Sequence, residues 1–435
     1  MTAESFLDEL QWRGQLHQTT ATKSEVEEHL ATPGRVAYCG FDPTRDSLTI
    51  GNLVAIMLLA RWQRAGHKPI VLMGGGTGMI GDPSGKDAER QLQSREQVAH
   101  NVAGQQALFA RFLDFHPRTS NCALLLDNAD WLEKLGYIEV LRDIGKHFSV
   151  NAMIQKESVR ERLHHREQGI SYTEFSYMLL QAYDFLHLKR TLGCSVQMCG
   201  SDQYGNVVAG IDLIHHTLGR EGDAGKAYGI AAPLLTRADG KKFGKTEQGA
   251  VWLSAERTSP YAFYQYLINV EDTDAIPFLK TFTFLSQQAI EQIATDHGKA
   301  PHERAAQRTL AREVTRLVHG QDELAKVEAA SQALFGGDVR ALDAAMLGEV
   351  FADVPHSEHD KSALEGEGRA LFELMALTTL ASSKGQARTL LESGAVSVNG
   401  ERVPAQRRLT SADLLHGSRI LLRRGKKQWH ATRWR

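Results

Sequence analysis

The chain has 435 residues, of which 42% are hydrophobic and 23% charged, a composition typical of a soluble globular protein. At this length one core is not enough, and we expect two to four domains. The charge is uneven: residues 384–435 carry twelve Lys and Arg against three acids, a net +9, which leaves −11 on the rest of a chain whose total is −2. A basic tail on an acidic body indicates an anionic partner for the tail, most often nucleic acid.

The N-terminal segment and the apolar runs argue against secretion and membrane insertion. MTAESFLDELQWRGQLHQTT lacks the apolar core of a secretory signal, and the longest apolar run, LVAIMLLA, is far shorter than a membrane span. We therefore predict a cytoplasmic protein that makes no membrane contact. The cysteines form no CxxC pair and have no histidines at zinc spacing, which predicts reduced thiols and no metal held by the protein alone. They are Cys39, Cys122, Cys194 and Cys199.

Residues 35 to about 225 alternate short apolar runs with helical periodicity, which predicts α/β structure. The runs RVAYCGFDP and KPIVLMGGGTG are predicted to be buried strands that end in turn residues, and SVQMCGSDQYGN another strand that enters a loop. A helix is predicted to begin just after Gly51, because apolar residues recur there at i, i+3, i+4 and i+7. These residues are Leu53, Ile56, Met57 and Ala60. A strand, a loop and a helix N-terminus in this order present backbone N–H groups to an anion.

A dinucleotide-binding motif is matched but set aside. The segment 76–81, GTGMIG, fits G-x-G-x-x-G after an apolar strand, and Glu96 lies at the spacing of that fingerprint. The third glycine should open a helix, yet DPSG follows and favours a turn. A Walker A loop is excluded as well, because Asp87 rather than Ser or Thr follows Lys86. The oxidoreductase reading is therefore disfavoured.

From about residue 255 the pattern becomes helical. Ser259-Pro260 is a good helix start, and REVTRLVHG is a good helix end at Gly320. Residues 353–369 are polar and lack periodicity, which predicts a linker. The tail is predicted to hold a helix in SKGQARTLLESG and a hairpin that turns at Asn399-Gly400.

Three lysines lie between glycines in residues 240–249, GKKFGKTEQG. A lysine cluster is usually a solvated turn, but flanking glycines let backbone and side chains close around a polyanion. The segment is therefore a candidate phosphate-binding loop, named the lysine loop below.

Five segments resemble, in family order, the motifs of bacterial tyrosyl-tRNA synthetases, which are class I enzymes. They are YCGFDPTRDSLTIGNL at 38–53, GDPSGK at 81–86, SYTEFSYMLLQAYDF at 171–185, GSDQYGN at 200–206 and KKFGKT at 241–246, the last similar to the second class I signature, KMSKS. The resemblance covers nearly the whole chain. It implies a Rossmann-like parallel-sheet catalytic domain with a dimer-interface insertion (1–225), the lysine loop with an α-helical anticodon-side domain (226–350), a linker (351–369) and a small α+β RNA-binding module of the S-four type (370–435).

The activity implied by this resemblance is tyrosine–tRNA ligation. The tyrosine carboxylate attacks the α-phosphorus of ATP, pyrophosphate leaves, and tyrosine then passes to the 3′-terminal adenosine of tRNA(Tyr). In such a reaction the protein mainly aligns the reactants and supplies positive charge that neutralises the leaving pyrophosphate. Mg²⁺ is expected to arrive with ATP and to keep most of its waters. Lys241 is equally well a plain surface charge, and the residues implied in catalysis are Thr44, Thr49, Asn52, Lys86, Arg90, Lys242, Lys245 and Thr246.

The first class I signature departs from its family form. Where H-I-G-H normally stands, this chain has Thr49-Ile50-Gly51-Asn52. Asn52 keeps a hydrogen-bond donor, whereas Thr49 is shorter than histidine and uncharged. Thr44 is expected to share the role of Thr49 toward the γ-phosphate. We therefore expect the site to depend more on the lysine loop and on Lys86 and Arg90.

A site that selects tyrosine must hydrogen-bond the phenol, because buried polar groups left unpaired penalise phenylalanine; enzymes of this family are a known example. The resemblance implies that Tyr38 and Asp184 meet the phenol, and it assigns the ammonium group to Asp82, Tyr177 and Gln181. The last two share a spacing of i, i+4 and i+7 with Asp184, so one helix face can present all three. Gln203 is implied near the α-phosphate or the tyrosine carboxylate. Residues implied at ATP are Cys39, Gly40, Asp42, Gly51, Gln197, Asp202, Leu234, Leu235 and Lys245.

The basic tail is expected to contact tRNA phosphates, and Trp429 and Trp434 to stack on unpaired bases. Its implied RNA-binding residues are Lys384, Arg388, Arg407, Arg408, Arg423, Arg424, Lys426 and Lys427. The family works as a homodimer, and we predict the interface in LRDIGKHFSVNAMI at 141–154. Two alternatives stay open: the tryptophan-specific sister enzyme, which gains nothing from Tyr38 and Asp184, and an RNA-binding paralogue with weakened catalysis, which only Thr49 supports.

Overall fold

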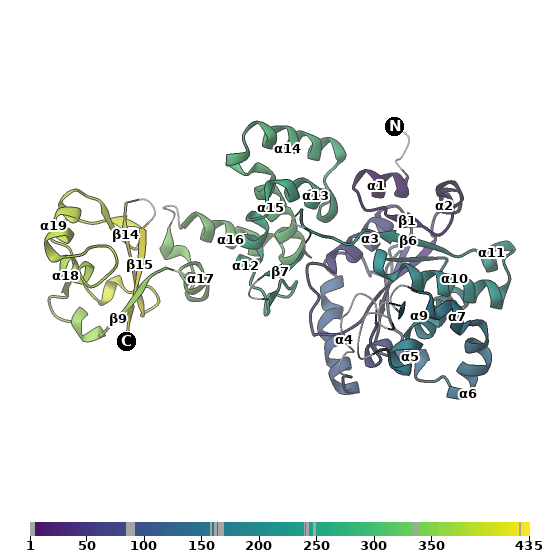
Figure 1. Ribbon diagram of the computed structural model, residues 1–435. Helices are drawn as coiled ribbons and strands as arrows, with labels where there is room; N and C mark the ends of the chain where they lie inside the picture. Colours follow the sequence, from purple (N-terminus) through teal and green to yellow (C-terminus); the bar gives the residue numbers. More distant parts are fainter. Residues whose placement is uncertain are drawn as a thin grey trace. The chain divides into compact units, whose positions relative to one another are not determined.

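The computed structural model describes residues 5–83, 92–156, 159–160, 163, 169–238, 240, 243–246, 249–333, 338–352, 354–425 and 428–435. The chain folds into two compact units, the first made of residues 1–259 and 266–318 and the second of residues 260–265 and 319–435. These units are not the four predicted regions, whose boundaries stay a prediction. The predicted fold class is confirmed, with an α/β first unit and a sheet-containing C-terminal unit (Figure 1).

The first unit is built on a six-stranded sheet of order β1-β6-β5-β2-β3-β4. Its strands are β1 (Gln18–Thr19), β2 (Val36–Phe41), β3 (Lys68–Met73), β4 (Leu124–Asp127), β5 (Val196–Gly200) and β6 (Tyr228–Ala232). All neighbours are parallel except β1 and β6. The chain proceeds outward from β2 to β3 and β4, and in the opposite direction from β5 to β6. The strand order therefore reverses between β2 and β5, which is where open α/β sheets bind ligands.

The first unit also contains helices, and the predicted strands and helix are confirmed. The helices are α1 (Phe6–Trp12), α2 (Lys23–Leu30), α3 (Leu53–Arg64), α4 (Arg95–Phe109), α5 (Ala129–Leu132), α6 (Tyr137–Glu139), α7 (Val150–Ile154), α9 (Tyr172–Leu192), α10 (Tyr204–Leu218), α11 (Gly222–Gly225), α13 (Asp272–Phe282), α14 (Gln287–Lys299) and α15 (Ala305–His319), with α12 (Pro260–Ile268) shared between the units. In α3 all four apolar positions predicted from periodicity are buried. The predicted start at Pro260 and the predicted end before Gly320 are also observed.

The long helix α9 carries three predicted site residues. The Ser171 hydroxyl accepts a hydrogen bond from the Glu174 backbone, and Gly193 ends the helix with φ 65°. Its apolar residues share one core with α10, in which Phe185 is fully buried together with Val207 and Ile214. Because the helix is anchored at both ends and along this core, it holds the face with Tyr177, Gln181 and Asp184 in a fixed position.

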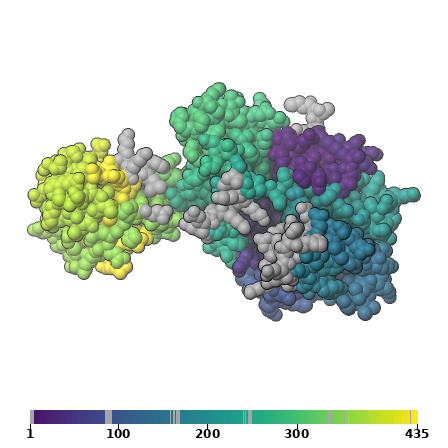
Figure 2. All heavy atoms as spheres, viewed as in Figure 1, coloured from purple at the N-terminus to yellow at the C-terminus, as the bar shows by residue number. Residues whose placement is uncertain are grey.

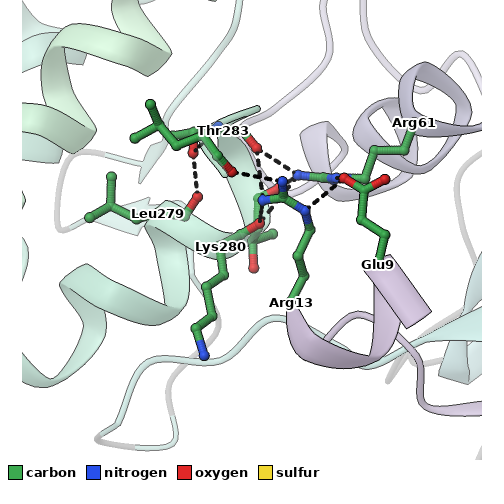
Figure 3. A network of polar contacts seen from close by, with 8 residues as sticks. Glu9, Arg13, Arg61, Leu279, Lys280 and Thr283 are labelled. Carbon is green, nitrogen blue, oxygen red and sulfur yellow. Dashed lines mark hydrogen bonds and ion pairs between the residues drawn. The ribbon is translucent and has the colours of Figure 1, made fainter. Parts of the chain in front are cut away.

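Two buried arginines tie the N-terminal segment and α3 to the end of α13 (Figure 3). Arg61 on α3 and Arg13 after α1 both donate to backbone carbonyl oxygens there, and Glu9 accepts from Arg13 Nε at 2.9 Å. These carbonyls belong to Lys280, Thr281, Thr283 and Leu285. Figure 2 shows the purple N-terminal segment against the green segment that includes α14. Cations at a helix C-terminus are stabilising, so the network fixes α13 against the sheet helices.

Arg61→Met is expected to lower the free energy of unfolding of the first unit by about 2 kcal/mol. Methionine keeps the apolar volume but leaves the Thr281 carbonyl, which accepts from Arg61 at 2.9 Å, without that donor. Calorimetry should show a melting temperature about 5 °C lower. Arg64→Met, at an exposed position on the same helix, is the matched control and should melt like the wild type. Equal melting of both variants would contradict the role of this network.

The second unit has a five-stranded sheet of order β12-β11-β14-β15-β9 and a two-stranded sheet of β10 and β13. The strands are β9 (His356–His359), β10 (Arg369–Ala370), β11 (Val396–Val398), β12 (Glu401–Arg402), β13 (Arg408–Leu409), β14 (Arg419–Arg424) and β15 (Gln428–Trp434), and the helices are α16 (Gln321–Ala333), α17 (Ala344–Val350), α18 (Leu371–Met375) and α19 (Lys384–Glu392). The predicted hairpin turns at Asn399 and Gly400, both with positive φ. The predicted helix over SKGQARTLLESG is α19.

Two expectations for this unit are wrong. Residues 353–369 are not a linker, because β9 within them pairs in parallel with β15 and completes the sheet. A polar edge strand carries no hydrophobic alternation, so no local pattern indicates it. Trp429 and Trp434 are buried rather than available for base stacking. Trp429 packs edge-on against Phe351 at 5.0 Å, and Trp434, on the opposite face of β15, belongs to the hydrophobic core of this unit.

Candidate active site

A cavity of about 260 Å³ lies at the carboxyl ends of β2 and β5, where the strand order reverses. Residues from β2 and the loop after it, from α9 and from β5 line its wall. Predicted site residues in this wall are Tyr38, Cys39, Gly40, Asp42, Thr44, Asn52, Asp82, Tyr177, Gln181, Asp184, Gln197 and Gln203. The fold thus brings side chains from widely separated stretches of sequence to one cavity.

One part of the wall pairs a buried carboxylate with a buried phenol. Asp184 accepts a hydrogen bond from Asn128 Nδ2 at 2.9 Å and from Trp131 Nε1 at 2.7 Å, one on each oxygen. Burial raises the pKa of Asp184 to about 7, against the lowering effect of these two donors. The buried Tyr38 hydroxyl has no hydrogen-bond partner among the described residues. An acceptor and a hydroxyl are therefore both available to a polar group of a ligand.

Asn128 extends this network across the cavity wall. Its Nδ2 also donates to Thr77 Oγ1 at 3.0 Å, and that hydroxyl donates to Asp42 Oδ1 at 2.9 Å. The Tyr177 hydroxyl donates to the other oxygen of Asp42 at 3.0 Å. A Cβ on Gly74 would lie 2.3 Å from Asp42 Oδ1, so glycine is required where the strand end approaches the carboxylate. Asp42, predicted at ATP, and Tyr177, predicted at the amino acid, are thus linked.

A second carboxylate lies in an amide cluster. Gln203 Nε2 donates to Asp82 Oδ2 at 2.6 Å, and Asn206 Nδ2 donates to Gln181 Oε1 at 2.9 Å and to Gln203 Oε1 at 3.1 Å. These residues lie on three segments, the loop after β3, α9 and the start of α10. Asp82 supplies negative charge and Gln181 an amide, which suits an ammonium group.

The residues predicted for ATP divide into two groups. Cys39 and Gly40 line the cavity on β2, and burial raises the pKa of the Cys39 thiol to about 12, which keeps it neutral. Asp202 and Leu234 do not line the cavity, but both lie close to Gly200, which does line it. Leu235 and Gly51 do not line the cavity either. The Leu235 carbonyl instead accepts from the backbone N–H of Phe243 at 3.3 Å.

Helix α4 holds the loop after β2 by side-chain amides. Asn101 Nδ2 donates to the Pro43 carbonyl at 2.9 Å and Gln105 Nε2 to the Arg45 carbonyl at 2.7 Å. Thr44, which lies between them, lines the cavity. The amides satisfy backbone carbonyls that a loop would otherwise leave unpaired. They therefore fix the backbone on both sides of Thr44, whose hydroxyl is predicted to act in catalysis.

The lysine loop is anchored by its phenylalanine. Phe243 is buried among Tyr266, Phe278 and Phe282, with ring centroids 4.2–5.5 Å away. The next backbone N–H, of Gly244, donates to the Tyr266 hydroxyl at 2.9 Å. A Cβ on Gly244 would lie 2.6 Å from Ile50 Cγ2, so the loop backbone passes close to the first signature.

Several predicted residues lie wholly or in part outside the described residues. The backbone of Lys245–Thr246 forms β7, which pairs with β8 (Gly249–Ala250). Their side chains lie outside what the structure describes, and so do Lys86, Arg90, Lys241 and Lys242.

Three functional residues were not predicted from the sequence: Asn128, Trp131 and Thr77. All three act on the carboxylates of the cavity. The signal that could have found the first two is their position directly after the apolar run ALLLD, because side chains after a parallel strand gather at the ligand edge of the sheet.

The second unit has a basic hollow of about 420 Å³ lined by Arg388, Arg407 and Arg408 together with Glu392 and Phe372. The Arg388 guanidinium lies over the Phe372 ring at 4.3 Å. Three other predicted RNA-binding residues, Lys384, Arg423 and Arg424, are not lining residues. Lys384 pairs with Glu373, Arg423 lies over the Trp429 ring, Arg424 donates to the Leu380 carbonyl, and Lys426 and Lys427 lie outside the described residues.

Among the described residues, no group of three or more His, Cys, Asp or Glu side chains could hold a metal ion. Within the same part of the chain, every helix is too short or too polar to cross a membrane.

Known proteins resemble this chain over nearly its whole length. Residues 33–336 match the family model of class I tRNA synthetases (W and Y), and residues 347–432 match that of the tyrosine–tRNA ligase SYY-like C-terminal domain. The chain is 49% identical to the tyrosine–tRNA ligase of Roseiflexus castenholzii over 99% of each chain. It is also 49% identical to that of Geobacillus stearothermophilus, over 98% of this chain and 99% of the relative. A C-terminally truncated mitochondrial tyrosyl-tRNA synthetase from Aspergillus nidulans superposes with a TM-score of 0.67 at 30% identity, covering 76% of this chain and 94% of the other.

Proposed function

The chain belongs to the class I tRNA synthetases for tryptophan and tyrosine, and from this premise we propose that it is a tyrosine–tRNA ligase. It activates L-tyrosine with ATP to give tyrosyl-adenylate and pyrophosphate, and then transfers tyrosine to the 3′-terminal adenosine of tRNA(Tyr). The observation that carries the tyrosine half of the proposal is Asp184, a buried carboxylate facing the cavity together with the unpaired hydroxyl of Tyr38.

This pair suits a phenol, which can donate to the carboxylate and accept from the hydroxyl; phenylalanine can do neither, and the indole N–H of tryptophan can donate but cannot accept. The ligand hydroxyl would donate to Asp184 and accept from Tyr38, and a ligand without that hydroxyl would leave the Tyr38 hydroxyl buried and unpaired. At the other carboxylate, Asp82 and Gln181 would hold the ammonium group, with Gln203 beside the ligand carboxylate. The amino acid is thereby oriented with its carboxylate toward the nucleotide.

The chemistry of activation is mainly alignment and charge neutralisation. ATP would enter along Gly40 and the Gly200 edge, where Asp202 and Leu234 lie, with its phosphates toward Thr44 and Asn52. Mg²⁺ would arrive with ATP as part of the substrate. Positive charge for the departing pyrophosphate would come from the lysine loop, whose Gly244 backbone passes beside Ile50.

The direct test is pyrophosphate exchange with each of the twenty amino acids in turn. We expect exchange with tyrosine and at least 10³-fold less with phenylalanine or tryptophan. Exchange with tryptophan instead would identify the sister specificity. No exchange with any amino acid would remove the ligase proposal.

Tyrosine affinity is expected to fall as the pH drops below about 7. The pKa of Asp184 is raised from its ordinary 3.8 to about 7, so the free site is protonated below that pH and loses its charge-assisted acceptor. By the same shift, the unfolded chain releases this proton first, so the free energy of unfolding falls as pH rises from about 4 to 7. Fluorescence titration of tyrosine between pH 5.5 and 8.5 measures the binding effect. Asp184→Asn should flatten the profile, and an unchanged slope in that variant would assign it to another group.

The tRNA half of the proposal is supported by the basic hollow in the second unit. Arg388 is exposed and lies over the face of Phe372, beside Arg407 and Arg408. Arg388→Glu is expected to raise the KM for tRNA roughly tenfold and to lower the salt slope of binding by about 1. Arg388→Lys, which keeps the charge, should stay near the wild type. Pyrophosphate exchange, which needs no tRNA, should be the same in all three; loss of exchange in Arg388→Glu would count against an RNA-specific role.

We further propose a homodimer that works in the bacterial cytoplasm, where tRNA is charged for translation. Apolar side chains around the predicted interface at 141–154 are exposed, namely Tyr137, Ile138, Leu141 and Val150. An exposed apolar patch of this kind is typical of a protein interface. Sedimentation of wild type and Ile138→Glu measures the dimer.

A further inference from the structure

Thr49 and Asn52, which replace the two histidines of the first signature, are hydrogen-bonded to each other. The Asn52 Oδ1 atom accepts from the Thr49 backbone N–H and from the Thr49 hydroxyl, both at 2.9 Å. In return, the Asn52 backbone N–H donates to the Thr49 carbonyl at 2.9 Å. The two residues therefore form a closed pair at the start of α3, and Asn52 is the residue directly before that helix.

This pair fixes which side-chain atom of Asn52 is the oxygen. A backbone N–H can only donate, so the atom 2.9 Å from Thr49 N must be the acceptor Oδ1. The donor Nδ2 then occupies the other position on the amide, and it has no hydrogen-bond partner within the described part of the chain. A flipped amide would set Nδ2 against the Thr49 N–H, donor to donor.

The two residues differ in their relation to the cavity. Asn52 lines it together with Thr44 and Ala55, whereas Thr49 does not line it. The Thr49 hydroxyl is engaged with Asn52, and the Thr49 backbone bridges to Trp252 on the side of the lysine loop. The group that faces the cavity at this signature is thus Asn52.

We propose that Thr49 is a positioning residue that acts through Asn52: it holds Oδ1, so that Nδ2, the donor that the first class I signature presents to ATP, is oriented in advance. The inference rests on the proposed function. Holding Oδ1 with two donors orients the amide before the nucleotide binds, so less side-chain freedom is lost on binding. It also explains how the signature works without histidine at position 49, since no contact from Thr49 to the γ-phosphate is needed.

A double-mutant cycle tests this pathway, with kcat/KM for ATP in tyrosine-dependent pyrophosphate exchange as the measured quantity. Asn52→Ala removes the donor and should lower kcat/KM roughly 10- to 100-fold. Thr49→Val removes the hydroxyl but keeps the backbone donor, and should lower it roughly three- to tenfold, mostly through KM for ATP. In the Asn52→Ala background, Thr49→Val should change kcat/KM by less than about twofold, because there is no longer an amide to orient. Thr49→Ser, which restores the hydroxyl, should recover the wild-type value.

Additive losses in the double variant would overturn the inference, because they would mean that Thr49 contacts the nucleotide itself. An equal KM for tyrosine in all variants shows that the fold is retained. A variant with an altered KM for tyrosine would also overturn the inference, because the substitution would then act beyond the nucleotide. If the wild type exchanged no pyrophosphate, the proposed function would fail separately. The same cycle would then be measured by calorimetric titration of ATP, where coupling of the two substitutions supports the pair and additivity rejects it.

Discussion

Asp184→Asn is expected to lower kcat/KM for tyrosine roughly 10³-fold while KM for ATP stays near the wild-type value. Asp184 is buried, and each of its oxygens already accepts one N–H, from Asn128 and from Trp131. An asparagine has only one oxygen, so its NH₂ group must face one of these two donors. The ligand phenol loses its charged acceptor, and a buried donor is left unpaired, two costs that act together.

The preference for tyrosine over phenylalanine is a sharper measure of the effect of Asp184→Asn. Phenylalanine never used the carboxylate, so its poor activation should change little, and the preference for tyrosine should shrink accordingly. Asp130→Asn is the matched control, because Asp130 is exposed on α5 between Asn128 and Trp131. It should exchange pyrophosphate like the wild type. A variant at Asp184 that keeps its preference for tyrosine would contradict the assignment of the phenol site.

Local patterns predicted those parts of the fold that local sequence determines. The helix face with Tyr177, Gln181 and Asp184 follows from the spacing i, i+4, i+7, and all three side chains line the cavity. The strands β2, β3 and β5 follow from apolar runs that end in turn residues. The period of a helix and the burial of a parallel strand are properties of short stretches, so they can be read without knowing the partners.

The remaining features depend on partners far away in the chain. Asn128 and Trp131 reach Asp184 across more than fifty residues of sequence, and no pattern around them states that contact. The strand β9 is polar and is held by pairing with β15, so its sequence resembles a linker. Two tryptophans among arginines were predicted to stack on bases, yet both are buried: Trp434 lies in the core of the unit and Trp429 packs against Phe351. In each case a contact with a distant part of the chain determines the position of the residue, and composition alone does not predict that contact.

Lys245→Ala is expected to slow tyrosine-dependent pyrophosphate exchange roughly 10²- to 10³-fold, with KM for tyrosine unchanged. The ammonium group would act on charge that builds up on the departing pyrophosphate, so its loss should appear mainly in kcat. The backbone supports this position. Phe243 is fixed among three aromatic rings, Gly244 lies against Ile50 of the first signature, and Lys245 follows on β7.

Lys226→Ala is the matched control, since Lys226 is an exposed lysine of the same unit that pairs with Asp223. It should leave exchange unchanged. Lys245→Arg separates charge from fit: a planar guanidinium keeps the positive charge but changes the reach, so partial activity is expected. Exchange at the wild-type rate in Lys245→Ala would show that the lysine loop does not neutralise the leaving group, and the anchored Phe243 would then serve the fold rather than the reaction.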